Sequence, residues 1–277
     1  MGTATEPINA GLVARWLTIC VVKTRNQKYL RRVWKPSPGL LSVFGVCIKV
    51  KPFEHLAEAY AMQFVARHTS IPVPKVYCAF IHDGDTYIVM GRINGQMAWH
   101  GWRNRPEKSK KRILDQLRRM VGELRSISLP EGVGVGSVDG GSFCDCRLPS
   151  KLFWGPFATI RDFHQALAND ADTEADHEKL PPDLSDLSDL FAFYRQPFGK
   201  SVLTHGDLSS LNILVKGDKV VGIIDWETAG WFPRYWEYTC AKNVINNAFS
   251  EEEIDMFLEP MPHELKMERI RRKYFDF

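Results

Sequence analysis

The stretch from Leu203 to Trp226, LTHGDLSSLNILVKGDKVVGIIDW, limits what this chain can fold into more than any other part of its sequence. It reads as the end of a strand, a polar loop and two apolar runs. Lys216-Gly217-Asp218-Lys219 separates the runs and has a composition that suits a tight turn, so we expect an antiparallel hairpin. Pairing across this hairpin brings Asn212 close to Asp225. The two side chains are therefore expected to offer oxygen ligands to one site.

The oxygen ligands expected in this hairpin suit Mg²⁺, which takes few protein oxygens and completes its shell with water and phosphate. Asp207, on the preceding loop, can orient an acceptor hydroxyl and take its proton while phosphate is transferred. His205-Gly206-Asp207, then Asn212 and Asp225, repeats the order of a kinase catalytic loop and its later metal-binding aspartate. We therefore expect Asp207 to be catalytic and Asn212 and Asp225 to bind metal. His205 is expected to be a buried hydrogen-bonding brace of the loop.

The part of the chain before Met90 favours strands, because its apolar residues come in short runs rich in Val, Ile and aromatic residues. These runs lie at Leu17–Val22, Phe44–Val50, Val76–Phe80 and Tyr87–Met90. One helical pattern interrupts them at Phe53–His68, where Leu56, Tyr60 and Phe64 recur four residues apart.

The pattern after Met90 becomes mainly helical. We expect helices at Lys110–Ile127 and Ile160–Leu167, a polar linker at Asn169–Asp189, and a further helix that ends near Tyr194. The expected fold class is α+β with two lobes. A small, mostly β N-terminal lobe with one key helix covers residues 1–91, and a larger, mostly helical C-terminal lobe covers residues 92–277.

The catalytic-loop motif, Ile224-Asp225-Trp226-Glu227 and two further segments together resemble the aminoglycoside phosphotransferase family, especially its fungal members of unassigned substrate. The further segments are Thr69-Ser70-Ile71-Pro72-Val73-Pro74-Lys75-Val76-Tyr77 and Gly155-Pro156-Phe157-Ala158-Thr159-Ile160-Arg161-Asp162-Phe163. The resemblance covers most of the chain. It implies a bilobal protein-kinase-like fold with ATP or GTP and Mg²⁺ between the lobes. The catalytic loop, the metal and the acceptor then belong to the C-terminal lobe.

The N-terminal lobe contains the remaining parts that the resemblance implies. Val46-Cys47-Ile48-Lys49 resembles the strand that places a lysine on the α- and β-phosphates. Glu58, on the following helix, is the expected ion-pair partner of Lys49, with Glu54 as a competitor. Met90-Gly91-Arg92 occupies the place of the hinge, where backbone groups would meet the purine.

The acceptor is the least specified part of the expected site. Glu227, Trp231 and Glu237 lie where the family places its acceptor cleft, and aromatic walls with a few acids can hold a cationic or sugar-like ligand. The alternative is that the tryptophans here, which include Trp226 and Trp236, pack the large lobe. The sequence implies a small hydroxylated acceptor and does not identify it.

The protein-kinase glycine-rich phosphate cover is absent before Lys49. Residues Val33–Val46 offer only Gly39 and Gly45, with prolines nearby. This departure keeps open an alternative function, a nucleotide-binding pseudokinase or regulatory scaffold without phosphotransfer. A kinase acting on proteins fits less well, because the segment after Asp225 does not resemble a protein-kinase activation segment.

Composition bounds the partners and the compartment. The formal net charge is +3 and no long run has a single sign, so nucleic acid and anionic membranes are not expected partners. No stretch approaches the roughly 20 apolar residues that span a bilayer. The six cysteines are scattered apart from Cys144 and Cys146, which indicates reduced thiols and a cytoplasmic protein. The sequence does not specify an oligomeric state.

Overall fold

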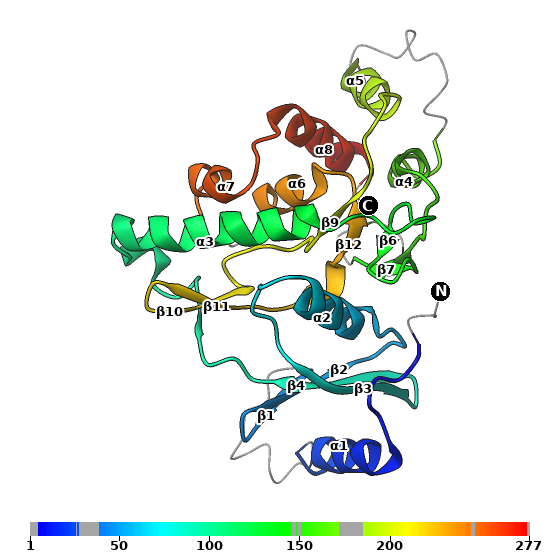
Figure 1. Ribbon diagram of the computed structural model, residues 1–277. Helices are drawn as coiled ribbons and strands as arrows, with labels where there is room; N and C mark the ends of the chain where they lie inside the picture. The colour runs from blue at the N-terminus through cyan, green and yellow to red at the C-terminus, as the bar shows by residue number, and fades with distance from the viewer. Residues whose placement is uncertain are drawn as a thin grey trace.

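The structure is a computed structural model and describes residues 5–25, 27, 39–145, 148, 151–171, 185–244 and 247–275. These residues form a smaller, sheet-based lobe and a larger, mostly helical lobe (Figure 1). One hydrophobic core cluster extends through both lobes, from Ile88 in the smaller to Trp226 in the larger. The expected boundary between residues 91 and 92 stays a prediction.

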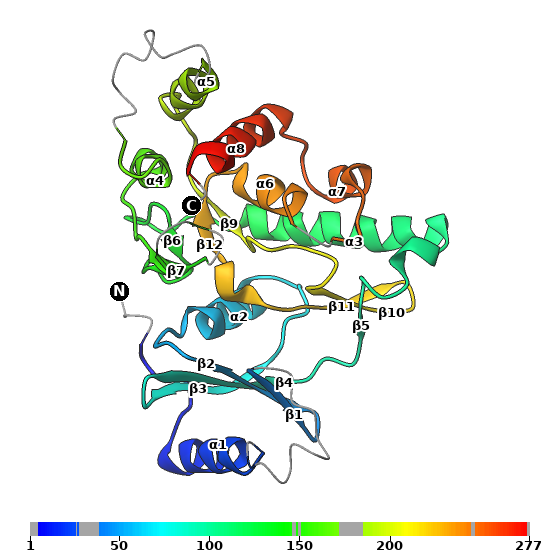
Figure 2. The ribbon, with the colours of Figure 1, turned by 180° about the vertical axis from the view of Figure 1, so that it is seen from behind.

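The smaller lobe is built on an antiparallel sheet with the strand order β1-β2-β4-β3. Helix α2 (Ala57–His68) lies on one face of this sheet and helix α1 (Leu12–Arg25) on the other, as both views show (Figure 1, Figure 2). Helix α2 therefore lies between the sheet and the larger lobe. The strands are β1 (Leu40–Val43), β2 (Val46–Lys51), β3 (Val76–His82) and β4 (Asp85–Gly91).

Helix α1 corrects the strand expected at Leu17–Val22. Ala14, Thr18 and Val22 recur four residues apart on the side of α1 that meets the sheet. This periodicity is helical. The β-branched residues of the segment favour a strand locally, but burial against the outer face of the sheet favours the helix.

The larger lobe combines helices with small antiparallel sheets. Its helices are α3 (Glu107–Ser126), α4 (Ile160–Leu167), α5 (Ser185–Tyr194), α6 (Trp236–Lys242), α7 (Glu251–Phe257) and α8 (Pro262–Phe275). The predicted helices at Lys110–Ile127 and Ile160–Leu167 are confirmed as α3 and α4. The linker expected at Asn169–Asp189 is wrong at its end, because α5 begins at Ser185. Residues 172–184 of that linker lie outside the described residues.

The small sheets of the larger lobe have the strand orders β11-β10-β5, β6-β12-β9 and β7-β8. Their strands are β5 (Gln96–Met97), β6 (Gly136–Ser137), β7 (Phe143–Cys144), β8 (Phe153–Trp154), β9 (Val202–Thr204), β10 (Ile213–Lys216), β11 (Lys219–Ile223) and β12 (Gly230–Phe232). The predicted hairpin is confirmed as β10 and β11, which pair Ile213 with Ile223. This hairpin and β9 carry the loops of the site.

Among the described residues, no helix combines the length and the apolar character needed to cross a membrane.

Candidate active site

Strand β9 leads directly into the loop that holds His205, Gly206 and Asp207. Gly206 has a positive φ of 82°, and a Cβ atom there would lie 2.7 Å from the carbonyl oxygen of Thr228. Such a conformation at such close approach requires glycine. The glycine of the motif therefore has a structural reason, since it lets the chain turn tightly between His205 and Asp207.

The structure brings Asp207, Asn212 and Asp225 together. Asn212 Nδ2 donates to both the main-chain oxygen and Oδ2 of Asp207, each at 2.8 Å. The main-chain N–H of Ile224 donates to the carbonyl oxygen of Asn212 at 2.9 Å, which fixes the next residue, Asp225, beside Asn212. Asp225 has a left-handed conformation, with φ 63° and ψ 62°. A non-glycine residue in this region carries strain of a kind often found at functional sites.

His205 is fully buried and makes contacts that suit a brace. Its Nε2 lies 3.1 Å from the carbonyl oxygen of Ile224, and the N–H of Asp207 donates to its Nδ1 at 3.2 Å. The ring also packs edge-on against Trp226, with centroids 4.5 Å apart. His205 thus connects the catalytic loop to the strand end that carries Asp225.

Glu237, on helix α6, accepts hydrogen bonds from the same loop. Its Oε2 accepts from the N–H of His205 at 2.6 Å and its Oε1 accepts from the N–H of Gly206 at 3.1 Å. Arg125 of α3 donates to the carbonyl oxygen of Leu203 and to Thr204 Oγ1 nearby. A buried carboxylate that accepts two backbone N–H groups is well satisfied and fixes the loop geometry.

Lys49, on β2, reaches across to the larger lobe. Its Nζ lies 2.9 Å from Glu58 Oε1 and 2.6 Å from Asp225 Oδ1. Burial acts to lower the pKa of Lys49, but the charges of Glu58 and Asp225 outweigh burial and hold that pKa above its ordinary value. Burial acts to raise the pKa of Asp225, but Lys49, followed by Lys51, holds it below its ordinary value. Glu54 is exposed, so the partner of Lys49 is Glu58.

A second lysine and a third carboxylate extend this network. Lys51 Nζ lies 2.5 Å from Glu58 Oε2 and 3.0 Å from Glu227 Oε2. Glu227 Oε2 also lies 3.7 Å from Lys49 Nζ. Oxygens of Glu58, Asp225 and Glu227 lie within 4.8 Å of one another. Glu227 therefore belongs to the charged network of the site. Its expected place in the acceptor cleft stays a prediction.

A cavity of about 490 Å³ lies between the lobes beside this network. It is mainly apolar, and its lining includes Met90, Gly91 and Arg92, Leu40 and Cys47 of the smaller lobe, and Leu214 and Ile224 of the larger lobe. The N–H groups of Gly91 and Arg92 already donate to the carbonyl oxygens of Lys75 and Gly45, each at 2.8 Å. These two N–H groups are therefore already satisfied within the smaller lobe.

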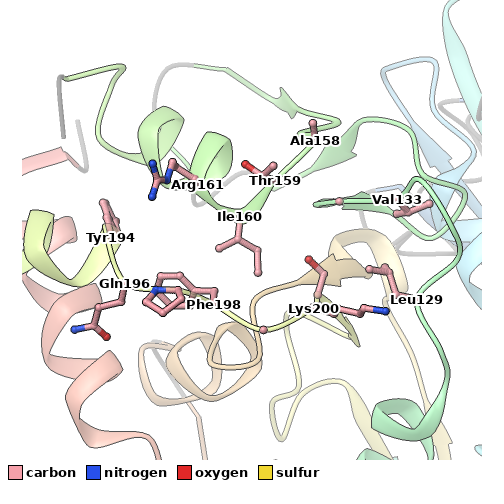
Figure 3. A pocket seen from close by; sticks show the side chains of 14 residues that line it. Leu129, Val133, Ala158, Thr159, Ile160, Arg161, Tyr194, Gln196, Phe198 and Lys200 are labelled. Carbon is pink, nitrogen blue, oxygen red and sulfur yellow. The ribbon is translucent and has the colours of Figure 1, made fainter. Parts of the chain in front are cut away.

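Another cavity, of about 320 Å³, lies in the larger lobe between the start of α4 and the segment after α5 (Figure 3). Ile160 points into it, and its lining also includes Leu129, Phe198 and Lys200. None of the predicted site residues lines this cavity, whereas Met90, Gly91 and Arg92 line the cavity between the lobes.

The structure corrects two members of the expected acceptor cleft. Trp231 is fully buried, and its Nε1 donates to the carbonyl oxygen of Val138 at 3.2 Å. Glu237 is 1% exposed and is occupied by the loop N–H groups. Trp226 and Trp236 are also buried, so the alternative of tryptophans packing the large lobe is the correct one.

Comparison with known proteins identifies the family. Residues 49–261, which form more than half of the chain, match the family described as "Phosphotransferase enzyme family". The chain belongs to this family. Membership confirms the predicted resemblance and the prediction of an enzyme, an aminoglycoside phosphotransferase-like kinase. The match begins at Lys49 and includes the whole catalytic loop.

Curated relatives of this phosphotransferase are similar at low identity. It is 23% identical over 205 residues to an aminoglycoside 3'-phosphotransferase of Enterococcus faecalis, covering 73% of this chain and 70% of the relative. It is 24% identical over 191 residues to an aminoglycoside 3'-phosphotransferase of Niallia circulans, covering 68% and 65%.

Solved structures confirm the fold class. A thermostable mutant of aminoglycoside phosphotransferase APH(4)-Ia in its apo form has a TM-score of 0.56 at 19% identity, over 86% of this chain and 79% of that one. ADP-bound APH(2'')-Ib has a TM-score of 0.56 at 15% identity, over 88% and 84%. The α+β bilobal, protein-kinase-like fold expected from the sequence is thus confirmed.

Two functional contacts were missed by the sequence reasoning. Lys51 follows Lys49 by two residues on the same strand, and side chains two apart share a face, so this signal was present. The capping of the loop by Glu237 had no local signal, because α6 meets β9 only through the tertiary fold.

Proposed function

We propose that this phosphotransferase transfers the γ-phosphoryl group of ATP or GTP to a hydroxyl group of a small acceptor, with Mg²⁺. The observation that carries the proposal is the contact between the lobes, where Lys49 Nζ lies 2.6 Å from Asp225 Oδ1. This contact brings the expected phosphate-binding cation to the expected metal-binding carboxylate. Direct transfer in such a site depends on positioning and on charge stabilisation.

In the proposed reaction Lys49, held by Glu58, binds the α- and β-phosphates. The purine occupies the cavity lined by Met90, Gly91 and Arg92. Asp207 orients the acceptor hydroxyl and takes its proton as the oxygen attacks the γ-phosphorus, and the nucleoside diphosphate leaves. Asn212 Nδ2 contacts Asp207 Oδ2 at 2.8 Å, which supports a fixed orientation for the carboxylate.

The residues present suit Mg²⁺, a hard cation with a preference for oxygen ligands. Asp225 carries the ionised carboxylate, and Asn212 offers its amide oxygen while its amide nitrogen is engaged by Asp207. When bound, the metal would neutralise charge on the phosphate oxygens. The carboxylates of Glu58 and Glu227 lie near Asp225, and both are paired with Lys51.

The nature of the acceptor is supported by known relatives. One solved structure similar to this chain, at a TM-score of 0.50 and 18% identity, is a ternary complex of an APH(4)-Ia mutant with ADP and hygromycin B. The curated relatives are named as aminoglycoside 3'-phosphotransferases. These names support a small acceptor with several hydroxyl groups. The correction at Trp231 and Glu237 means that the acceptor is recognised by other residues near Asp207.

We place the enzyme in the cytoplasm. Cys20, Cys47 and Cys78 are free thiols in the structure, which suits a reducing compartment. Cys146 lies outside the described residues.

The test is a screen of hydroxylated metabolites and aminoglycosides with Mg²⁺ and either ATP or GTP, read by mass spectrometry for an added phosphoryl group. The purified chain should produce a phosphorylated acceptor, and Asp207→Asn should not do so at a comparable rate. Binding of Mg²⁺ and nucleotide without any phosphorylated product across the screen would favour the pseudokinase alternative. The observation behind that alternative is the missing glycine-rich cover before Lys49, where Val33–Val46 offers only Gly39 and Gly45.

A further inference from the structure

Lys51 is a buried cation that none of the roles above requires. It lies on the same strand as Lys49, and 7% of its side chain is exposed. Its Nζ is 5.5 Å from the centre of the Phe53 ring, which itself packs edge-on against Phe153 of the larger lobe. A lysine is seldom buried this deeply without paired charges, so its partners explain its position.

The partners of Lys51 are carboxylates that also contact Lys49. Glu58 uses one oxygen for each lysine, Oε1 for Lys49 and Oε2 for Lys51. Glu227 Oε2 lies closer to Lys51, at 3.0 Å, than to Lys49, at 3.7 Å. Around Asp225, therefore, the described network contains three carboxylates and two ammonium groups.

This charge count creates a requirement when nucleotide binds. Lys49 would then donate hydrogen bonds to phosphate in place of Asp225. Asp225 would leave Lys49 and bind the metal. If Lys49 were the single cation available to Glu58, which is buried, and to Glu227, which is partly buried, both carboxylates would hold it back, because a charge removed from water without a partner is costly.

We propose that Lys51 is a positioning residue that neutralises Glu58 and Glu227 and so releases Lys49 for phosphate. This inference rests on the proposed function and deepens it by assigning a second lysine to the phosphate site. Lys51 remains on its two carboxylates throughout the reaction, while Lys49 exchanges Asp225 for the nucleotide.

The experiment is calorimetric titration of ATP into the full chain, with EDTA and separately with Mg²⁺. With EDTA, Lys51→Met should weaken ATP binding by roughly 10-fold, within the range of couplings between groups in contact. Lys51→Arg should restore binding, because it keeps the charge. The double variant Lys51→Met with Glu227→Gln removes one charge of each sign and should recover most of the affinity. Lys216→Met, on the exposed hairpin turn, is the matched control and should bind as the native chain does.

Glu227→Gln alone separates this role from metal binding and remains informative if Lys51→Met cannot be purified. The proposal predicts that it binds ATP in EDTA at least as tightly as the native chain and keeps the gain in affinity on adding Mg²⁺. Loss of that gain would show that Glu227 is a metal ligand and would overturn the assignment. Equal weakening in Lys51→Met and the double variant would show that Lys51 acts only in packing. Absence of ATP binding in the native chain and Lys216→Met would instead contradict the proposed function itself.

Discussion

The two halves of the active site are held by different forces. The catalytic loop with Asp207 is fixed within one lobe by neutral and charge-assisted hydrogen bonds, chiefly from His205 and Glu237. The half that contains Lys49, which we propose binds phosphate, is held by ion pairs between the lobes, and its central contact joins Lys49 to Asp225, 176 positions apart in the chain. The difference separates a part that is already assembled from a part that must exchange partners.

This difference has a chemical reason. A general base has to be oriented before the acceptor arrives, and backbone N–H groups bound to a buried carboxylate do not need to move for that. A lysine that binds phosphate has to stay charged and has to become accessible when the nucleotide binds. Carboxylates pair with its ammonium group until phosphate replaces them. Changes in the half that contains Asp207 should therefore affect both the orientation of this carboxylate and the stability of the fold. Changes in the half that contains Lys49 should affect the binding of metal and nucleotide.

The largest expected effect comes from breaking the exchangeable half at Asp225. Asp225→Asn removes the charge shared by Lys49 and the proposed metal, so turnover should fall by about 1,000-fold, a loss equivalent to several kcal/mol of charge stabilisation. The Mg²⁺ dependence of the initial rate measures this loss. Asp218→Asn, in the hairpin turn, is the control and should keep its rate. A native rate and native metal dependence in Asp225→Asn would remove the metal from this half of the site.

The preassembled half is tested at Glu237. Glu237→Ala leaves the N–H groups of His205 and Gly206 without their acceptor. Because unsatisfied buried donors are costly, the free energy of unfolding should decrease by about 3 kcal/mol. Turnover should fall with it, while the affinity for Mg²⁺ and nucleotide should change little. Urea unfolding and calorimetric titration measure the two quantities.

The matched control for Glu237 is Glu259→Ala. Glu259 pairs with Arg234 at 2.6 Å, but both side chains are more than half exposed, so removing it should change stability by less than about 1 kcal/mol. If Glu237→Ala were as stable as this control, the loop would not depend on its buried carboxylate, and the contrast between the halves would fail.

A smaller effect concerns the pH dependence of stability. We expect the main acid-sensitive group to lie outside both halves of the site. The raised pKa of Lys49 and the lowered pKa of Asp225 keep their pair charged through neutral and mildly acidic pH. Burial instead lowers the pKa of His164 to about 3, and its Nε2 lies 2.7 Å from the Tyr235 hydroxyl. Below pH 6.5 the unfolded chain binds a proton at this residue that the folded chain does not bind. Stability should therefore decrease as pH falls, by about 2 kcal/mol at pH 5.

Unfolding free energies at pH 7 and pH 5 test this expectation. His164→Gln should lose much of the difference, although His55, whose pKa is also lowered by burial, keeps a contribution of the same sign. An unchanged pH dependence in His164→Gln would contradict the assignment of the acid sensitivity to His164.

Sequence reasoning reached the parts of the site that are encoded locally. The hairpin of β10 and β11 follows from apolar runs and a turn, and it sets Asn212 beside Asp225 without any knowledge of the rest of the fold. The helical period of Phe53–His68 placed Glu58 on α2, and the structure selects Glu58 over Glu54 as the partner of Lys49. Both inferences depend on periodicity over a few residues.

The failures share a dependence on tertiary contacts. Whether Trp231 lines a cleft or packs a core depends on Val138 and Phe64, which lie far from it in the sequence. The segment of helix α1 predicts a strand because the local sequence does not reveal that this segment is buried against the sheet. Glu237 was predicted in the right neighbourhood, but its role follows from where α6 meets the catalytic loop.

The most direct test of the central claim is Asp207→Asn, measured by calorimetry with Mg²⁺ and nucleotide and by single-turnover phosphoryl transfer. Asparagine keeps the size of the side chain but cannot take a proton. If Asp207 is the general base, this variant should fold and bind nucleotide as the native chain does, with transfer reduced by roughly 100-fold or more, the scale of a general base. Full transfer activity in Asp207→Asn would contradict the proposed mechanism.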